Sequence, residues 1–145
     1  MIRSRLEQGQ TRRIAAALAA LAVACLAGLL FFLNPEYPRL YPPCVFHHLT
    51  GWHCPGCGTA RGLHALIHGR LVQALAFNPF MVAVLPFLAV AGARGLRDAL
   101  AGGPPKTRRL TPAWAIWLLA GLVGAFWALR NIPWFPFTLL APHRL

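Results

Sequence analysis

An uninterrupted apolar run from Ile14 to Leu33 constrains this chain more than any other feature. The run contains twenty residues without a charge, follows Arg12-Arg13 and ends at Asn34-Pro35. At about 1.5 Å per residue, a helix of this length spans roughly 30 Å, the thickness of a bilayer's hydrocarbon core. The run is also longer than the apolar core of a secretory signal. It therefore predicts a retained transmembrane helix.

The composition also favours lipid as the surrounding medium. The chain is 57% hydrophobic and only 12% charged, whereas a soluble domain of similar size carries more polar surface. The net charge of +11 comes from basic residues that cluster beside the apolar runs, as topogenic residues that contact anionic headgroups do. A nucleic-acid-binding face would interleave basic and aromatic side chains. We therefore expect the lipid bilayer as a partner and no nucleic acid.

Two further apolar runs predict an all-α membrane protein with three transmembrane helices. We expect these helices at about 14–33, 71–93 and 113–129, within a single membrane domain over 1–145. The remaining segments are a Cys/His-rich loop over 34–70, a basic loop over 94–112 and an aromatic tail over 130–145. Because the tail combines aromatic residues with prolines, it is typical of an interfacial segment.

The second apolar run contains a helix-breaking pair. Pro79 lacks a backbone N–H donor, and Asn78 is a good cap for a helix that starts at Pro79. The chain could therefore kink there, or end one helix and begin another. A helix that starts at Pro79 would have only about fifteen apolar residues before Arg94, which is short for a span. One kinked helix over 71–93 is the favoured interpretation.

Basic residues predict the orientation of the chain. The N-terminal segment and the 94–112 loop carry nine of them (four and five), whereas the 34–70 loop and the tail carry five (three and two). Cytoplasmic segments of membrane proteins are enriched in Lys and Arg. We therefore expect the N-terminus in the cytoplasm and the Cys/His-rich loop on the extracytoplasmic side.

The most informative stretch of this loop is Cys54-Pro55-Gly56-Cys57-Gly58. Two intervening residues let both sulfurs turn toward one centre, as in a metal knuckle, and Cys44 supplies a third thiol. A complete tetrahedral site needs a fourth ligand, and the nearby histidines are His47, His48 and His53. The spacing is specific for a tight CxxC turn and is compatible with a zinc site, but it is weak evidence for zinc because the second knuckle of an ordinary zinc ribbon is missing.

The same cysteines have other uses that the sequence leaves open. Thiols in an oxidising compartment tend to pair, so Cys54 and Cys57 could close a small reducible ring, or Cys44 could pair with either of them. A thiol just before a helix start has a lowered pKa, which suits a redox-active pair. A structural disulfide, a metal site, a redox pair and plain reduced thiols all remain compatible with the sequence.

The segment from Thr59 to Gly69 predicts a short amphipathic helix, with Thr59 as its N-cap and Gly69 as its stop. Arg61, His64 and His68 fall within about 60° of one another on its polar side. In one interpretation the helix lies on the membrane with this side in water. In the other the stripe faces inward, where Arg61 holds an anionic group and the histidines ligate or relay protons. Arg61 is the first residue that we expect to be functional.

The string Cys54-Pro55-Gly56-Cys57-Gly58-Thr59-Ala60-Arg61, followed by His68-Gly69 and Ala76-Phe77-Asn78-Pro79, resembles a bacterial family of small multi-helix membrane proteins. This family is "domain of unknown function 2752". The tail pattern Arg130-Asn131…Pro136…Leu139…Pro142 is similar to the family's C-terminal pattern, so the resemblance runs from Cys44 to Pro142. It implies a bacterial inner-membrane location and a site around Cys54, Cys57, Arg61 and Asn78. It implies no particular reaction.

The sequence favours a non-enzymatic protein. It has only three carboxylates, spread over the chain (Glu7, Glu36 and Asp98), which excludes paired-carboxylate chemistry, and it has no serine with a convincing base. We expect a binding or assembly module for lipid, another membrane protein or a second copy of the chain, with a disulfide or a metal ion stabilising the CPGCG loop. The alternatives are a membrane thiol oxidoreductase that uses the CxxC pair and a transporter or channel subunit.

Overall fold

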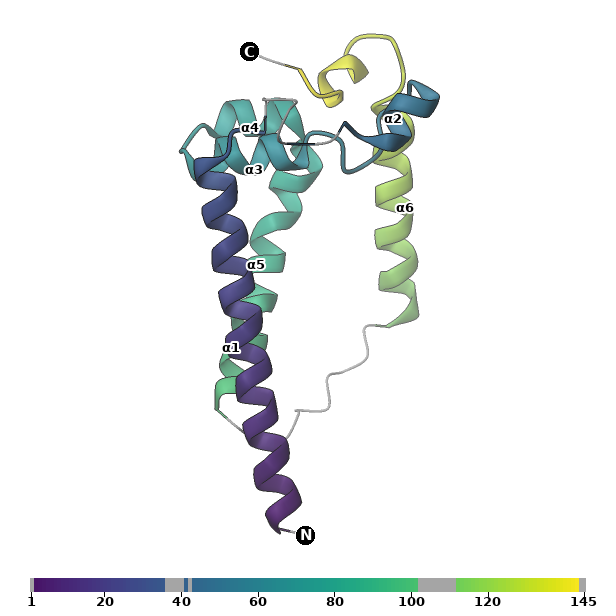
Figure 1. The fold of residues 1–145 in the computed structure, drawn as a ribbon. Coiled ribbons are helices and arrows are strands. Elements are labelled where there is room, and N and C mark those ends of the chain that lie inside the picture. The colour runs from purple at the N-terminus through teal and green to yellow at the C-terminus, as the bar shows by residue number, and fades with distance from the viewer. Residues whose placement is uncertain (1, 36–40, 42, 102–111, 144–145) are drawn as a thin grey trace. The chain divides into compact units, whose positions relative to one another are not determined.

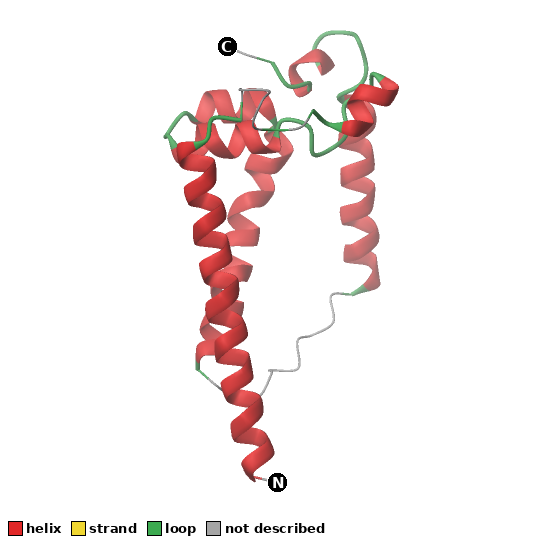
Figure 2. Cartoon of the chain, viewed as in Figure 1, coloured by secondary structure: helices red, strands yellow, loops and turns green. Residues whose placement is uncertain are grey.

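The computed structural model describes residues 2–35, 41, 43–101 and 112–143, and these residues form helices and loops without a strand (Figures 1 and 2). The predicted all-α class is thus confirmed. By its internal contacts the chain divides into two units, unit 1 (Met1–Leu29 with Leu85–Leu110) and unit 2 (Leu30–Val84 with Thr111–Leu145). In chain order the helices are α1 (Ile2–Phe32), α2 (Val45–Thr50), α3 (Thr59–Ile67), α4 (Leu71–Phe77), α5 (Pro79–Leu100), α6 (Ala113–Leu129) and the 3-10 helix η1 (Phe137–Leu140).

Two helices are long and apolar enough to cross a membrane. They are Gly9–Phe32, which lies within α1, and Pro79–Leu100, which is α5. Only 6% and 0% of these apolar stretches are buried inside the protein, unlike the core helix of a soluble domain. Helix α6 is also apolar but has 17 residues, the lower end of the range for a span. The first predicted span therefore matches a helix of sufficient length, the second apolar helix begins later than predicted, and the third span stays a prediction.

The favoured interpretation of one kinked helix over 71–93 is wrong, because the structure has two helices there. Helix α4 ends at Phe77, and Asn78 has extended backbone torsions (φ −162°, ψ 92°). The side-chain oxygen of Asn78 accepts a hydrogen bond from the Met81 N–H at 3.0 Å and so caps α5. Helix α5 begins at Pro79, where a missing N–H leaves no helical hydrogen bond unmade.

The length of α5 explains why that interpretation failed. Helix α5 does not stop at Arg94 but continues to Leu100, giving 22 residues, because arginine is a good helix former. A helix that starts at Pro79 is therefore long enough to span. The basic loop predicted over 94–112 begins correspondingly later, and its residues 102–111 lie outside the described part of the chain.

Unit 2 has a small apolar core between α3 and α4, formed by Ala65, Ala74 and Phe77 with Leu66 and Val82 packed against them. A turn at Gly69 (φ +75°) reverses the chain between the two helices, in the left-handed region that favours glycine. The C-terminal tail is attached to this pair, since η1 contacts α4 and the His143 N–H donates to the Ala76 carbonyl (3.2 Å). Helices α3 and α4 and the tail thereby form the scaffold for the cysteine-bearing loop.

The last turn of α6 also belongs to this scaffold. The ring of Phe126 stacks on that of Phe80, with 5.1 Å between centroids. The ring of Trp127 meets that of Phe46 edge to face at 5.8 Å. These contacts bring the end of α6, and the residues that follow it, beside the loop that carries the cysteines.

Candidate functional site

The segment from Cys54 to Cys57 forms a tight turn that leads into α3. The Cys57 N–H donates to the Cys54 carbonyl at 3.0 Å. Gly58, with φ +86°, is the N-cap residue of α3, so the prediction of Thr59 in that role is wrong, and Thr59 is the first helical residue. A side chain at position 58 would require strained backbone torsions, and its Cβ would clash with the Phe77 carbonyl oxygen. Glycine is therefore needed there for two reasons.

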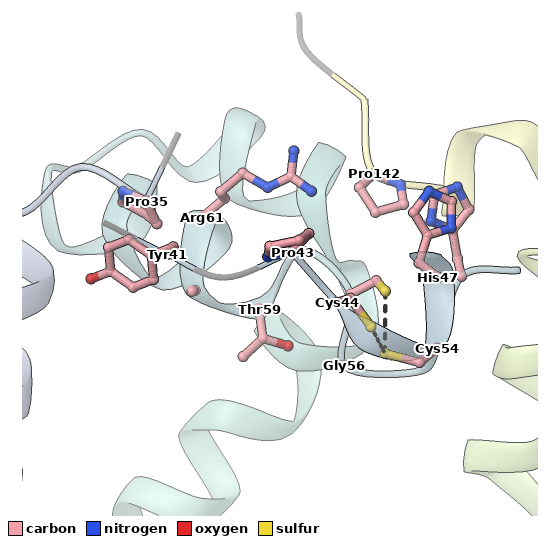
Figure 3. Close-up of a pocket in the computed structure, with 14 residues that line it drawn as sticks. Pro35, Tyr41, Pro43, Cys44, His47, Cys54, Gly56, Thr59, Arg61 and Pro142 are labelled. Carbon is pink, nitrogen blue, oxygen red and sulfur yellow. Dashed lines mark hydrogen bonds between the residues drawn. The ribbon is translucent and has the colours of Figure 1, made fainter. Parts of the chain in front are cut away.

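Three thiols meet beside this turn. The Cys54 sulfur lies 3.2 Å from the Cys57 sulfur and 3.5 Å from the Cys44 sulfur, and all three lie within 4.8 Å of one another (Figure 3). Three sulfurs bound to one tetrahedral zinc ion at about 2.3 Å stand about 3.8 Å apart, so this spacing fits three corners of such a site. Among the described residues, no histidine or carboxylate joins the cluster.

Arg130, which was not among the site residues predicted from the sequence, holds the turn by binding the turn's backbone carbonyls with its side chain. The side chain is 1% exposed. Its Nη1 donates to the carbonyls of Cys54 (3.0 Å) and Pro55 (3.1 Å), and its Nη2 donates to that of Cys57 (3.1 Å). Its Cζ lies 4.8 Å from the ring centre of Phe126. No described carboxylate pairs with it, and its Nε is buried without a hydrogen-bond partner. Arg130 is therefore a buried cation that is met chiefly by carbonyl dipoles.

Two asparagines complete the support of the turn. Asn78, which is 1% exposed, donates from Nδ2 to the Pro55 carbonyl at 3.0 Å. Asn131 pairs with the backbone of His53 in both directions, accepting its N–H at 2.8 Å and donating to its carbonyl at 2.9 Å. We call Asn78, Arg130 and Asn131 the clamp. Because the clamp binds backbone groups, it fixes the turn without using the sulfurs, which remain available to bind a metal ion or to form a disulfide.

The local environment shifts the pKa values of the Cys44 and Cys57 thiols in opposite directions. A hydrogen bond from the backbone of His47 lowers the pKa of the Cys44 thiol. Burial, reinforced by hydrogen bonds with Cys54 and Cys44, raises the pKa of the Cys57 thiol to about 12. Burial also lowers the pKa of Arg130, and the neighbouring Cys57 and Cys54 oppose that change. The buried cation and the thiols thus interact most favourably when the cluster carries negative charge.

The sulfurs line a pocket of about 590 Å³ (Figure 3). His47 and His53, whose rings stack with 4.4 Å between centroids, form another part of its wall, whereas His48 does not. Arg61 reaches the same pocket from α3. Its Cζ lies 5.1 Å from the ring centre of Phe77, and it forms no hydrogen bond or ion pair with the residues that the structure describes. The structure therefore brings Arg61 together with the three cysteines.

The predicted polar stripe of α3 divides into two parts: the ring centroids of His64 and His68 lie 4.3 Å apart, whereas Arg61 lines the cysteine pocket. His64 is 7% exposed, and its Nδ1 forms a hydrogen bond with the Leu30 carbonyl. His68 stacks on Phe31 with 4.5 Å between ring centroids. The interpretation that places the whole stripe in water is thus wrong for His64. Neither histidine lines the cysteine pocket, so Arg61 is the one member of the stripe that does.

The clamp shows what sequence reasoning missed. Asn78 was predicted as a site residue, but Arg130 and Asn131 entered only through the resemblance of the tail to a family pattern. The local signal was an arginine and an asparagine placed directly after an apolar run. Their contacts with the turn could not be read from the sequence, because 73 to 78 residues separate the partners.

Comparison with known families agrees with the motif. Residues 44–92 match the family model described as "Protein of unknown function (DUF2752)". The chain resembles that family. The matched region contains the three clustered cysteines, Arg61 and Asn78, and the predicted resemblance is confirmed there; Arg130 and Asn131 lie beyond it. No curated protein and no solved structure matches the chain.

Proposed function

We propose that this chain is a small bacterial membrane protein whose three clustered cysteines bind one zinc-class metal ion. The bound ion would make the CPGCG loop a fixed binding module rather than a catalytic site. The observation that carries the proposal is the convergence of the Cys44, Cys54 and Cys57 sulfurs beside the buried Arg130. The residues present fit zinc, because thiolate sulfur is a preferred zinc ligand and the sulfur spacing suits a tetrahedral centre.

A metal–thiolate centre also accounts for the charge of Arg130. A buried guanidinium without an anionic partner is unfavourable by several kcal/mol, and three neutral thiols would not compensate it. One metal dication with three thiolates carries a single net negative charge, which matches the charge of Arg130. Metal binding would displace the thiol protons. The high pKa of Cys57 in the metal-free protein is therefore compatible with ligation.

The membrane location is supported by the apolar helices and by their exposed side chains. On α6, for example, Trp114 and Trp117 are 67% and 76% exposed, and Ile116 between them and Leu118 after them are also exposed. A helix that is apolar all round suits lipid. We infer that α6 is the third span, that lipid is a partner, and that the pocket faces the extracytoplasmic side, as the distribution of basic residues predicts.

Metal analysis of the purified protein tests the proposal. We expect the detergent-solubilised chain, prepared without oxygen, to carry one zinc ion per chain. Cys54→Ser should lose the metal, because Cys54 touches both other thiols. Cys25→Ser is the matched control and should keep it, since Cys25 is an exposed residue of α1. A wild-type protein free of metal, or one in which Cys25→Ser loses as much metal as Cys54→Ser, would contradict the proposal.

A membrane thiol oxidoreductase is the second candidate. The observation that favours it is the position of Cys54, whose sulfur contacts the sulfurs of both Cys44 and Cys57. A thiolate on Cys57 could attack a Cys44–Cys54 disulfide, forming a Cys54–Cys57 bond and releasing the Cys44 thiolate without net electron transfer. Metal-free protein with two of these cysteines joined would favour this candidate over the metal centre.

A further inference from the structure

The pocket beside the cysteines contains a cation that the metal centre does not use. Arg61 is the third residue of α3, and its guanidinium group offers five N–H donors. Its close contact in the described structure is the face of Phe77, at 5.1 Å. No described residue accepts a hydrogen bond from it or forms an ion pair with it. Its donors are therefore available to a ligand in the pocket.

The described residues that line the pocket with Arg61 include no acidic side chain. Apart from Glu36, which lies outside the described residues, the sequence of unit 2 contains no acidic side chain. Helix α3 begins at Thr59 on the pocket wall, and a helix start adds partial positive charge. An anion entering the pocket would meet an attractive potential.

The proposed metal centre has room for one more ligand. Zinc prefers four ligands, and the described cluster supplies three sulfurs. With a singly charged ligand such as a phosphodiester in the fourth position, the centre would carry two negative charges, which Arg130 and Arg61 together would balance; a phosphate dianion would add one more negative charge. A volume of about 590 Å³ exceeds that of a single ion and lies within the range of small-molecule sites.

We propose that this pocket binds a ligand through a phosphate group, which Arg61 holds while one oxygen completes the metal's coordination. This inference rests on the proposed metal centre and names the ligand class for it. Arginine matches phosphate oxygens with its planar fork of donors. The group could belong to a free phosphate compound or to a phospholipid headgroup, because both present the same oxygens.

Cobalt(II) in place of zinc gives a direct test, because its visible absorption responds to a change of the fourth ligand. The cobalt-loaded full chain in dodecyl maltoside would be titrated with inorganic phosphate in one arm and with soluble dihexanoylphosphatidylglycerol in the other. We expect a saturable spectral change in at least one arm, and the responding arm identifies the source of the group. Arg61→Gln should weaken the apparent affinity by at least about tenfold. Arg70→Gln is the matched control, because Arg70 is exposed and does not line the pocket, and it should bind like the wild type.

The outcomes separate the two proposals. A protein that binds no cobalt contradicts the metal centre, and the inference fails with it. A protein that binds one cobalt ion per chain but shows no spectral change with either probe overturns the inference alone. Equal affinity of Arg61→Gln and the wild type also overturns it. If Arg61→Gln does not take up cobalt, Arg61→Lys is the deciding variant, because it keeps the positive charge but lacks the planar set of guanidinium donors. A phosphate affinity of Arg61→Lys equal to that of the wild type would count against the proposal.

Discussion

Replacing Arg130 by methionine tests the clamp most sharply. The substitution removes the charge and three hydrogen bonds but leaves an apolar chain to pack against Phe126. Each of the three carbonyls keeps a second donor, because the Cys57 N–H still bonds to Cys54 and the Asn78 amide still bonds to Pro55 and Cys57. We therefore assign about 1 kcal/mol to each lost bond. The expected loss of unfolding free energy is about 3 kcal/mol.

Thermal unfolding in detergent measures this loss. At about 2–4 °C per kcal/mol for a chain of this size, the midpoint of Arg130→Met should fall by roughly 6–12 °C. Arg130→Lys should lie between the variant and the wild type, since it keeps the charge and loses the bidentate geometry. Arg70→Met, at an exposed position, should change the free energy by less than about 0.5 kcal/mol. The reasoning is refuted if Arg130→Met and Arg70→Met unfold at the same temperature.

Three further perturbations have defined outcomes. Asn78→Ala removes the cap of α5 and a donor to the turn, so its unfolding free energy should fall by about 2–3 kcal/mol in the same assay; a wild-type midpoint would argue against the clamp. Gly58→Ala should destabilise the protein more than Gly69→Ala, because both positions have positive φ but only a Cβ at 58 meets other atoms; equal midpoints would contradict this. In metal-free protein at mildly alkaline pH, iodoacetamide should modify Cys44 before Cys57, because a lower pKa leaves more thiolate at a given pH. Peptide mass spectrometry gives the order, and faster modification of Cys57 would show the opposite pKa ranking.

The sequence predicted the helices whose determinants are local. The run from Ile14 to Leu33 is apolar throughout and lies in α1 within a helix that is long and apolar enough to cross a membrane, because hydropathy over twenty residues needs no tertiary information. The break at Asn78 was visible as an alternative, since the capping residue and the proline are adjacent. The choice against it failed because Arg94 was treated as the end of an apolar segment, whereas it lies inside α5.

Only the parts of the site that depend on residues close together in the sequence could be predicted. The CxxC spacing indicated that Cys54 and Cys57 face one centre, and the structure brings the predicted third thiol, Cys44, to them without a histidine. The periodicity of α3 placed Arg61 and His64 on one side of the helix. It could not predict which residues that side would contact. One is on the pocket wall and the other is buried with a partner at Leu30. The contribution of Arg130 depends on tertiary packing that brings distant segments together.

The most direct measurement of the central claim is zinc K-edge X-ray absorption on the protein as purified without oxygen. A metal centre built by Cys44, Cys54 and Cys57 predicts three sulfur scatterers at about 2.3 Å and one lighter ligand at about 2.0 Å. Cys44→Ser should lose zinc, and any zinc that it retains should have no more than two sulfur scatterers. A first shell of nitrogen and oxygen alone, or a spectrum that Cys44→Ser leaves unchanged, would contradict the account.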